Sequence, residues 1–264
     1  MSGLTGKRVL NTRAIEQQSA LDRLLVERGA IPVSFPCIAI EPLESTAELD
    51  AELRHAAAGG YAWVLVTSTN TSQVLEARLR ALDLTLTARF GVVGETTASA
   101  VESWLGRKVD FVPDDQHGVA LADHLAIAPG DQVLIPASSK TRSDVAEAIR
   151  KRGGHPQVVA AYRTVTTGMA DSGWQMAETD FDGVAFASPS AVEGFVWRMR
   201  SAAKKPSDLS DSVIGCIGPT TFEAAVAAGF SNAIRASSYS LEGLVLALEQ
   251  RFSAIEHVEA SSTL

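Results

Sequence analysis

Hydroxyl side chains gather in four loops, and each loop follows directly after a short apolar segment. Val66 and Phe186 end two of these segments, and Val93 and Ile217 end two more. The hydroxyl residues in the loops are Thr67, Ser68, Thr96, Thr97, Ser188, Ser190, Thr220 and Thr221. If each segment is a strand with a helix after the loop, these hydroxyls lie beside the unpaired backbone N–H groups of a helix N-terminus. Such groups favour carboxylates or phosphates, so the pattern predicts an anion-binding site.

The same residues have a simpler interpretation as helix caps. Ser and Thr are usual N-cap residues, because the side-chain oxygen accepts a hydrogen bond from the first turn of the helix. For any single loop, capping is the more common role. Four such loops at strand ends favour a binding site for the group, whereas Thr96 and Ser72 stay open between the two roles.

Three basic residues and one tyrosine are further candidates for the site. Arg13 follows the first apolar segment, and Lys140 and Arg142 follow its repeat later in the chain. The alternative for all three is a solvated surface charge. Tyr162 lies in an extended stretch, where its hydroxyl could donate a proton to a bound ligand. The alternative for Tyr162 is packing, which is the usual role of a tyrosine in a strand.

Several other chemistries lack their motifs. The sequence contains no G-x-G-x-x-G or Walker A pattern, so no nucleotide cofactor is predicted. It contains neither H-E-x-x-H nor a Cys/His ligand spacing, so no metal is predicted. The absence of a G-x-S-x-G elbow disfavours a serine hydrolase. We therefore expect a site without metal or cofactor.

The elements that must position these residues occur twice in the chain. One offset of 124 residues relates Leu10 to Leu134, Gly29 to Gly153, Pro32 to Pro156 and Gly94 to Gly218. Ser68 and Ser188 are 120 residues apart, so a short insertion or deletion separates the copies. Apolar strands alternate with helices in both copies, which is typical of parallel sheets. The sequence predicts an α/β fold with two doubly wound parallel-sheet lobes that arose by internal duplication.

Two extended stretches, near residues 36–42 and 160–166, occupy equivalent places and are expected to link the lobes. One lobe would then be an insert of residues 38–163, and the other would combine residues 1–37 with 164–264. We expect a cleft between the lobes to bind the ligand. Among individual elements, residues 109–112 are expected to form a strand and residues 15–28 a helix. The polar tail from Ile255 to Leu264 is expected to fray.

Composition restricts the partners and the compartment. The net charge of −8 disfavours nucleic acid and an anionic membrane surface as partners. The only cysteines, Cys37 and Cys216, predict a reducing compartment rather than a disulfide framework. The N-terminus lacks a signal-peptide pattern, and no apolar run reaches the ~18 residues of a membrane span. We expect a cytoplasmic monomer that binds a small molecule.

Seven segments, taken in order and with their spacing, resemble the uroporphyrinogen-III synthase family. They are residues 9–13, 63–70 (W-V-L-V-T-S-T-N), 93–98, 109–113, 158–164, 186–192 (F-A-S-P-S-A-V) and 217–221 (I-G-P-T-T). The resemblance covers nearly the whole chain and implies two α/β lobes joined by two extended linkers. It implies a reaction without cofactor or metal, in which the linear tetrapyrrole hydroxymethylbilane cyclises to uroporphyrinogen III. Water is lost in this reaction and ring D is inverted.

The resemblance also implies roles for individual residues. Tyr162 matches the family's tyrosine proposed to assist departure of the substrate hydroxyl. The positions that match residues lining the ligand site are Arg13, Thr67, Ser68, Lys140, Arg142, Ser188, Thr220 and Thr221. The chain departs from the family at residues 71–72, Thr-Ser where Gly-Val is common, and at residues 137–138, Ala-Ser in place of Arg-Gly.

Two other functions fit the same sequence features. A non-catalytic, bilobed cytoplasmic binder of an anionic small molecule would share the lobes and the cleft. A degenerate relative that serves as a scaffold is the second alternative. Retained tetrapyrrole binding without cyclase activity would indicate the binder.

Overall fold

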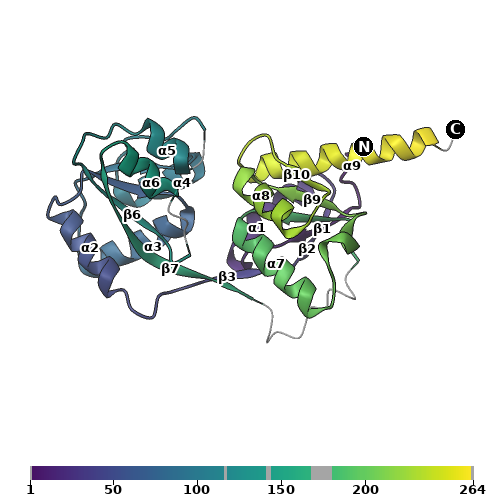
Figure 1. Ribbon diagram of the computed structural model, residues 1–264, viewed down its shortest axis with the longest axis horizontal. Coiled ribbons are helices and arrows are strands. Elements are labelled where there is room, and N and C mark those ends of the chain that lie inside the picture. Colours follow the sequence, from purple (N-terminus) through teal and green to yellow (C-terminus); the bar gives the residue numbers. More distant parts are fainter. Residues whose placement is uncertain (1, 116–117, 141–143, 168–179, 263–264) are drawn as a thin grey trace. The chain divides into compact units, whose positions relative to one another are not determined.

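The computed structural model describes residues 2–115, 118–140, 144–167 and 180–262 (Figure 1). The chain divides into two units. The first comprises Met1–Ala39 and Val165–Leu264, and the second comprises Ile40–Thr164. The chain therefore passes twice between the units. Both passages are extended, because each boundary falls within a strand, β3 (Ile38–Glu41) or β7 (His155–Thr166).

A five-stranded sheet forms the centre of the first unit. Its order is β10-β9-β8-β1-β2, and each neighbouring pair is parallel. The strands are β1 (Arg8–Asn11), β2 (Ile31–Ser34), β8 (Gly183–Phe186), β9 (Val213–Cys216) and β10 (Ala233–Arg235). The helices are η1 (Ile15–Gln17), α1 (Gln18–Glu27), α7 (Pro189–Ser201), η2 (Pro206–Leu209), α8 (Pro219–Ala228) and α9 (Leu241–Ser262).

Helices cover both faces of this sheet because successive strand residues point to opposite sides. In β1, Leu10 packs into a core cluster with Phe195 of α7, whereas Val9 packs into another with Leu244 of α9. All four of these side chains are fully buried. The first unit is therefore doubly wound, with α7 and α8 on one face and α1 and α9 on the other.

The second unit contains its own five-stranded sheet. Its order is β3-β7-β6-β4-β5, and the pairs from β7 to β5 are parallel. The remaining strands are β4 (Trp63–Val66), β5 (Arg89–Val92) and β6 (Gln132–Ser138). The helices are α2 (Ala47–Ala57), α3 (Thr69–Leu82), α4 (Glu95–Leu105), α5 (Gly118–His124) and α6 (Asp144–Lys151).

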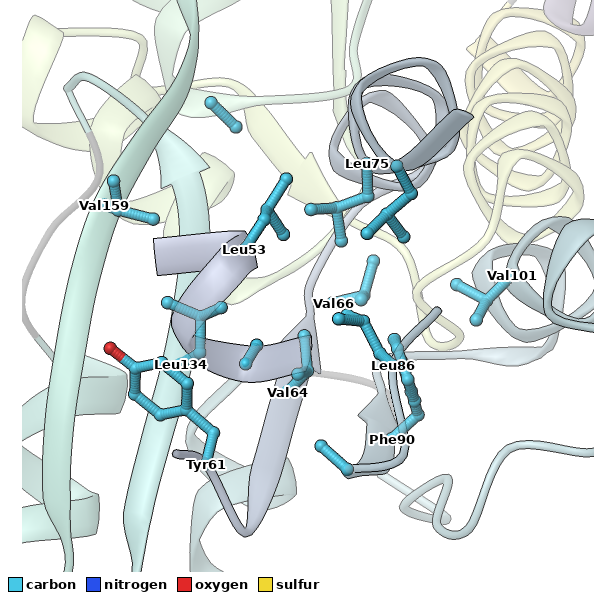
Figure 2. Packing of buried hydrophobic residues seen from close by; sticks show 14 of the residues in the cluster. Leu53, Tyr61, Val64, Val66, Leu75, Leu86, Phe90, Val101, Leu134 and Val159 are labelled. Carbon is cyan, nitrogen blue, oxygen red and sulfur yellow. The ribbon is translucent and has the colours of Figure 1, made fainter. Parts of the chain in front are cut away.

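Alternation along the strands again produces two cores. Val64 and Val66 of β4 point into the cluster shown in Figure 2, where they pack with Leu75 of α3 and Val101 of α4. The alternate residue Leu65 packs into the opposite cluster, with α5 and α6. The predicted fold class, two doubly wound α/β lobes, is confirmed.

Four strands of each sheet are duplicated and lie in the same order, whereas the fifth strands, β10 and β3, lie at opposite ends of that order. β1, β2 and β9 of the first unit correspond to β6, β7 and β5 of the second, and β8 corresponds to β4. Gly91 and Gly215, in β5 and β9, show how closely the copies agree. A Cβ at Gly91 would meet the side chains of Leu121 and Leu125, and one at Gly215 would meet those of Leu244 and Leu248. In both units, a strand glycine makes room for leucines of the covering helix.

Four details differ from the sequence predictions. Residues 109–112 form no strand, because only Phe111 bridges to the sheet, at Gly91. The corresponding segment of the first unit is the short strand β10, which the sequence did not predict. Residues 15–17 are a 3-10 turn, so the α-helix begins at Gln18 rather than Ile15. The helix α9 continues through the predicted tail from Ile255 as far as Ser262, and this stretch contains no Gly or Pro.

Candidate functional site

Parallel strands bring the predicted site residues to the carboxyl-terminal edge of each sheet. We call the ends of β4, β5 and β6, with the adjoining part of β7, the second-unit edge. The ends of β1, β8 and β9 form the first-unit edge. The second-unit edge includes Thr67, Ser68, Thr96, Thr97, Lys140 and Tyr162, and the first-unit edge includes Arg13, Ser188, Ser190, Thr220 and Thr221. Arg142 lies outside the described residues.

Ser68 and Tyr162 meet at the second-unit edge. Ser68 is the N-cap of α3, and its Oγ accepts a hydrogen bond from the Thr71 N–H at 3.1 Å. The same oxygen lies 3.0 Å from the Thr71 hydroxyl and 3.2 Å from the Tyr162 hydroxyl. Ser68 is therefore both a helix cap and the hydrogen-bond partner of the candidate acid.

A β-bulge turns Tyr162 toward Ser68. Ala160 is paired with Ala137, but the next pair is Tyr162 with Ser138, so Ala161 is an extra residue in β7. As a result Ala161 and Tyr162, although adjacent, both pack into the same core cluster. Without the bulge, the alternation of a strand would send the Tyr162 side chain to the other face of the sheet.

The neighbouring polar residues are less enclosed. The Ser138 and Thr164 hydroxyls lie 3.1 Å apart, beside the bulge. Thr67 is half-buried at the end of β4, and Lys140 is exposed in the loop after β6. Lys140 is therefore at the predicted edge, with its ammonium group exposed to solvent.

Ser188 repeats the cap of Ser68 at the first-unit edge, but with a different neighbour. Its Oγ accepts from the Ala191 N–H at 3.2 Å, at the start of α7. Ala191 stands where the second unit has Thr71, so the cap has no second hydroxyl beside it. Within the described part of the chain the Ser188 hydroxyl proton has no acceptor, and it is free to donate to a ligand. Ser190 is half-buried in the first turn of the same helix.

Arg13 lies in the loop after β1 and is half-buried. Its Nη2 is 3.5 Å from the Gln17 Oε1, and none of the described carboxylates pairs with it. Burial lowers the pKa of the Arg13 guanidinium from its ordinary value. Because arginine remains charged in proteins at neutral pH, Arg13 is a partly desolvated cation that suits a carboxylate or phosphate ligand.

Two further helices at these edges begin with glycine instead of serine. Gly94 is the N-cap of α4 and Gly218 is the N-cap of α8, and neither can supply a side-chain cap. The next residues, Thr96 and Thr97 or Thr220 and Thr221, do not cap these helices either. The four threonine hydroxyls have no partner among the residues that the structure describes.

The structure thus separates the two roles that the sequence left open. Ser68 and Ser188 are caps, whereas Thr96 is not. Ser72 is also not a cap, because its buried Oγ accepts from the Trp104 indole N–H at 2.9 Å. The glycine-capped helices α4 and α8 therefore keep both threonine hydroxyls and first-turn N–H groups for a ligand.

Sequence reasoning missed two residues at the first-unit edge. The ring of Tyr239 lies 3.2 Å from the position of a Cβ on Gly218, so it covers the start of α8. Its signal was the run Ser238-Tyr239-Ser240 just before the last helix, which resembles the other hydroxyl-rich loops. Gln18, in α1, holds the Arg13 loop through its side chain, and no sequence pattern marked it.

The fold and the two edges define a class, namely two-unit α/β proteins that present hydroxyl and N–H donors at strand ends, an arrangement that suits an anionic ligand. Two solved structures share this fold. Their sequence identity to the chain is low, so the comparison with them shows the fold alone. A uroporphyrinogen III synthase from Thermus thermophilus superimposes with a TM-score of 0.66 at 20% identity, over 94% of this chain and 99% of that one. Uroporphyrinogen-III synthetase from Helicobacter pylori 26695 gives a TM-score of 0.58 at 16% identity, over 95% of this chain and 100% of that one.

Sequence comparison identifies the family within that class. Residues 19–246 match the family model described as uroporphyrinogen-III synthase HemD. Uroporphyrinogen-III synthase of Synechococcus elongatus is 27% identical over 94% of this chain and 96% of that protein. The porphyrin biosynthesis protein HemD of Ruminiclostridium josui is 30% identical over 84% of this chain, a match that covers 44% of that protein.

The chain belongs to the uroporphyrinogen-III synthase family. The predicted family is confirmed, and with it the predicted enzyme of tetrapyrrole biosynthesis. The alternative of a non-catalytic binder is not favoured. No helix in the part of the chain that the structure describes is long and apolar enough to span a membrane.

Proposed function

We propose that the chain cyclises hydroxymethylbilane to uroporphyrinogen III, with Tyr162 as the proton donor and Ser68 as its partner. The observation that supports these roles is the 3.2 Å contact between the Tyr162 hydroxyl and the Ser68 Oγ at the N-terminus of α3. Tyr162 is 7% exposed, so its hydroxyl is held in place by the core around its ring.

The hydrogen-bond inventory of Ser68 leaves the Tyr162 proton available. A serine hydroxyl has one proton and two lone pairs. One lone pair of Ser68 accepts from the Thr71 N–H, and the other can accept from the Thr71 hydroxyl at 3.0 Å. Ser68 then donates its own proton to the Tyr162 oxygen. In this arrangement the Tyr162 O–H can point to a substrate, and Ser68 stabilises the phenolate that forms.

The reaction needs one proton donor and strict positioning. The C–O bond of the hydroxymethyl group on ring A breaks with electrons from the pyrrole nitrogen, and Tyr162 supplies the proton that turns the leaving hydroxide into water. The resulting azafulvene is attacked by the substituted carbon of ring D, and a spiro intermediate forms. Rearrangement inverts ring D, and the proton released when the pyrroles regain aromaticity returns to Tyr162. One water is lost in total, and general acid assistance is typically worth about 10²–10⁴-fold, here toward the low end because water can partly replace Tyr162.

The remaining candidates are proposed to bind the substrate carboxylates. Arg13 supplies a charge without a carboxylate partner among the described residues, and Ser188 supplies a free hydroxyl proton. Thr97 and Thr221 are buried at glycine-capped helix N-termini, where each hydroxyl lies next to first-turn N–H groups. The other proposed contacts are Thr67, Thr96, Lys140, Arg142, Ser190 and Thr220.

We also propose that the chain acts in the cytoplasm as a monomer, without metal or cofactor. Cys37 and Cys216 are free and buried, which suits a reducing compartment. Burial raises the pKa of the Cys216 thiol to about 12 and that of Cys37 further. Neither thiol is therefore a nucleophile at neutral pH.

The direct test uses hydroxymethylbilane generated enzymatically in the same vessel. The purified chain is expected to give the III isomer after oxidation and separation, with and without a chelator. The control without the chain gives isomer I, because the free substrate closes without inversion. Isomer I alone in the presence of the folded chain would refute the proposal.

A further inference from the structure

We propose that Gln18 is a positioning residue that fixes the loop of Arg13 for substrate binding. This inference rests on the proposed role of Arg13 in binding a substrate carboxylate. Gln18 is the first residue of α1, and its side chain points back to the end of β1 rather than to solvent. It is 6% exposed, which is unusual for a glutamine at a helix start.

Both the nitrogen and the oxygen of the Gln18 side-chain amide form hydrogen bonds. Its Nε2 donates to the Asn11 carbonyl at 3.2 Å and to the Arg13 carbonyl at 3.0 Å. Its Oε1 accepts from the Ser34 hydroxyl, at the end of β2, at 2.7 Å. One side chain therefore ties the Arg13 backbone to two strand ends.

Asn11 holds the other side of the same loop. The Arg13 N–H donates to the Asn11 Oδ1 at 3.2 Å. The Asn11 Nδ2 donates to the Asp22 Oδ1 at 2.8 Å and to the Gln18 carbonyl at 3.1 Å. Asn11 is fully buried, so this network cannot exchange its partners for water without cost.

The consequence lies in the orientation of the guanidinium. Both backbone polar groups of Arg13 are bonded to this network, while its guanidinium has, among the described residues, only the long 3.5 Å contact with Gln17. The network therefore fixes the position of the Arg13 backbone, and a ligand carboxylate can fix the position of its guanidinium. A loose loop would have to be ordered when substrate binds, which weakens binding but leaves the later chemical steps unchanged.

The test is a double-mutant cycle with Gln18→Met and Arg13→Gln. Methionine keeps the length of the side chain but removes its donors and its acceptor. Gln18→Met is expected to raise KM on the order of tenfold, with kcat unchanged. In the Arg13→Gln background, where KM is already raised, Gln18→Met is expected to have no further effect, because the two residues act as a unit.

The control variant is Asn232→Leu. Asn232 also donates from a side-chain amide to backbone carbonyls in the first unit, those of Leu209 and Ser212, but it lies at the opposite ends of the strands. Its loss is expected to lower Tm without changing KM. If Gln18→Met does not fold, Ser34→Ala removes only the hydroxyl that orients the amide, and a smaller rise in KM is expected.

Three outcomes would overturn the proposal. They are an unchanged KM in folded Gln18→Met, a rise in KM that persists in the Arg13→Gln background, and a fall in kcat instead of a rise in KM. Failure of the proposed function is a separate result. It would show as an absence of isomer III with the unmodified chain, or as an unchanged KM in Arg13→Gln alone.

Discussion

The two sheet edges share their helix caps but differ in what surrounds them. In each unit one helix begins with serine, Ser68 or Ser188, and the next begins with glycine, Gly94 or Gly218. Duplication therefore supplied two similar sets of hydrogen-bond donors at helix N-termini. The difference lies in the partners of the two serines. The Ser68 hydroxyl bonds to the hydroxyls of Thr71 and Tyr162. The Ser188 hydroxyl accepts from a backbone N–H, and its proton has no acceptor among the described residues.

This difference suggests a division of labour between the copies. The second-unit edge contains a hydroxyl chain that ends at a buried tyrosine, which suits proton transfer. The first-unit edge contains Arg13 and the Ser188 hydroxyl, whose proton has no acceptor among the described residues, and both suit binding of carboxylates. We therefore expect loss of the Tyr162 hydroxyl at the second-unit edge to change kcat, and variants of Arg13 and Ser188 at the first-unit edge to change KM.

The largest effect is expected from a negative charge at the first-unit edge. Ser188→Asp keeps a good N-cap, so the Tm is expected to be unchanged or raised. The carboxylate would repel the substrate, and activity is expected to fall by at least about 100-fold, since close like charges cost several kcal/mol. Tm and kcat/KM measured together test this expectation.

Ser207→Asp is the matched control, because it adds the same charge to an exposed residue of η2. Normal activity of folded Ser188→Asp would mean that this loop does not contact the substrate.

Loss of the tyrosine hydroxyl is expected to have the next largest effect. Tyr162→Phe removes the proton donor but leaves the ring in its core, so kcat is expected to fall by about 100-fold at most, because water can partly replace the acid. A solvent deuterium isotope effect on kcat is expected to change in the variant. Tyr61→Phe is the control, since Tyr61 is a buried tyrosine of the same unit whose hydroxyl bonds to Glu52 of α2. Wild-type turnover in Tyr162→Phe would leave Tyr162 as a packing residue.

The glycine-capped helices are expected to show a smaller effect. Thr221→Ala removes one hydroxyl but no backbone N–H, so the loss in kcat/KM is expected to be about fivefold, near the ~1 kcal/mol of a neutral hydrogen bond. Thr97→Ala, its equivalent in α4, gives a direct comparison of the units. A loss above 100-fold in either variant would mean that the hydroxyl, rather than the helix N-terminus, carries the binding.

The smallest effect is expected from a change at the first residue of α4, which differs from the first residue of α8. Glu95 begins α4, whereas Pro219 begins α8, so only the second unit places a carboxylate beside the N–H groups. Glu95→Gln is expected to lower KM about twofold at low salt, because the N-terminus of α4 then no longer interacts with the Glu95 carboxylate and is available to a substrate carboxylate. The gain is expected to vanish at high ionic strength. An unchanged KM at low salt would argue against carboxylate binding at α4.

Much of the fold was predictable because the chain repeats its pattern. The strand ends that carry Ser68, Ser188, Gly94 and Gly218 were located from the repeat and from apolar segments. The short strand β10 was missed because three residues carry too little pattern, although the offset from Phe111 marks its place. The opposite error occurred at residues 109–112, which resemble a strand but form a single bridge.

The details of the site depended on geometry that the sequence does not show. The bulge at Ala161 decides which face Tyr162 occupies, and no residue type signals it. Whether a Ser or Thr is a cap depends on a shift of one or two residues at the helix start, and Thr96 lies two residues after the N-cap Gly94. The amide of Gln18 contacts Asn11 of β1 and Ser34 of β2, and such contacts exist only after the chain has folded.

The division of labour is tested most directly by measuring kcat and KM for Tyr162→Phe and Arg13→Gln under identical conditions, with enzymatically generated hydroxymethylbilane. We expect a fall in kcat with little change in KM for Tyr162→Phe. We expect a rise in KM with little change in kcat for Arg13→Gln. If both folded variants show the same fall in kcat and the same rise in KM, the two edges do not have separate roles, and the division of labour is contradicted.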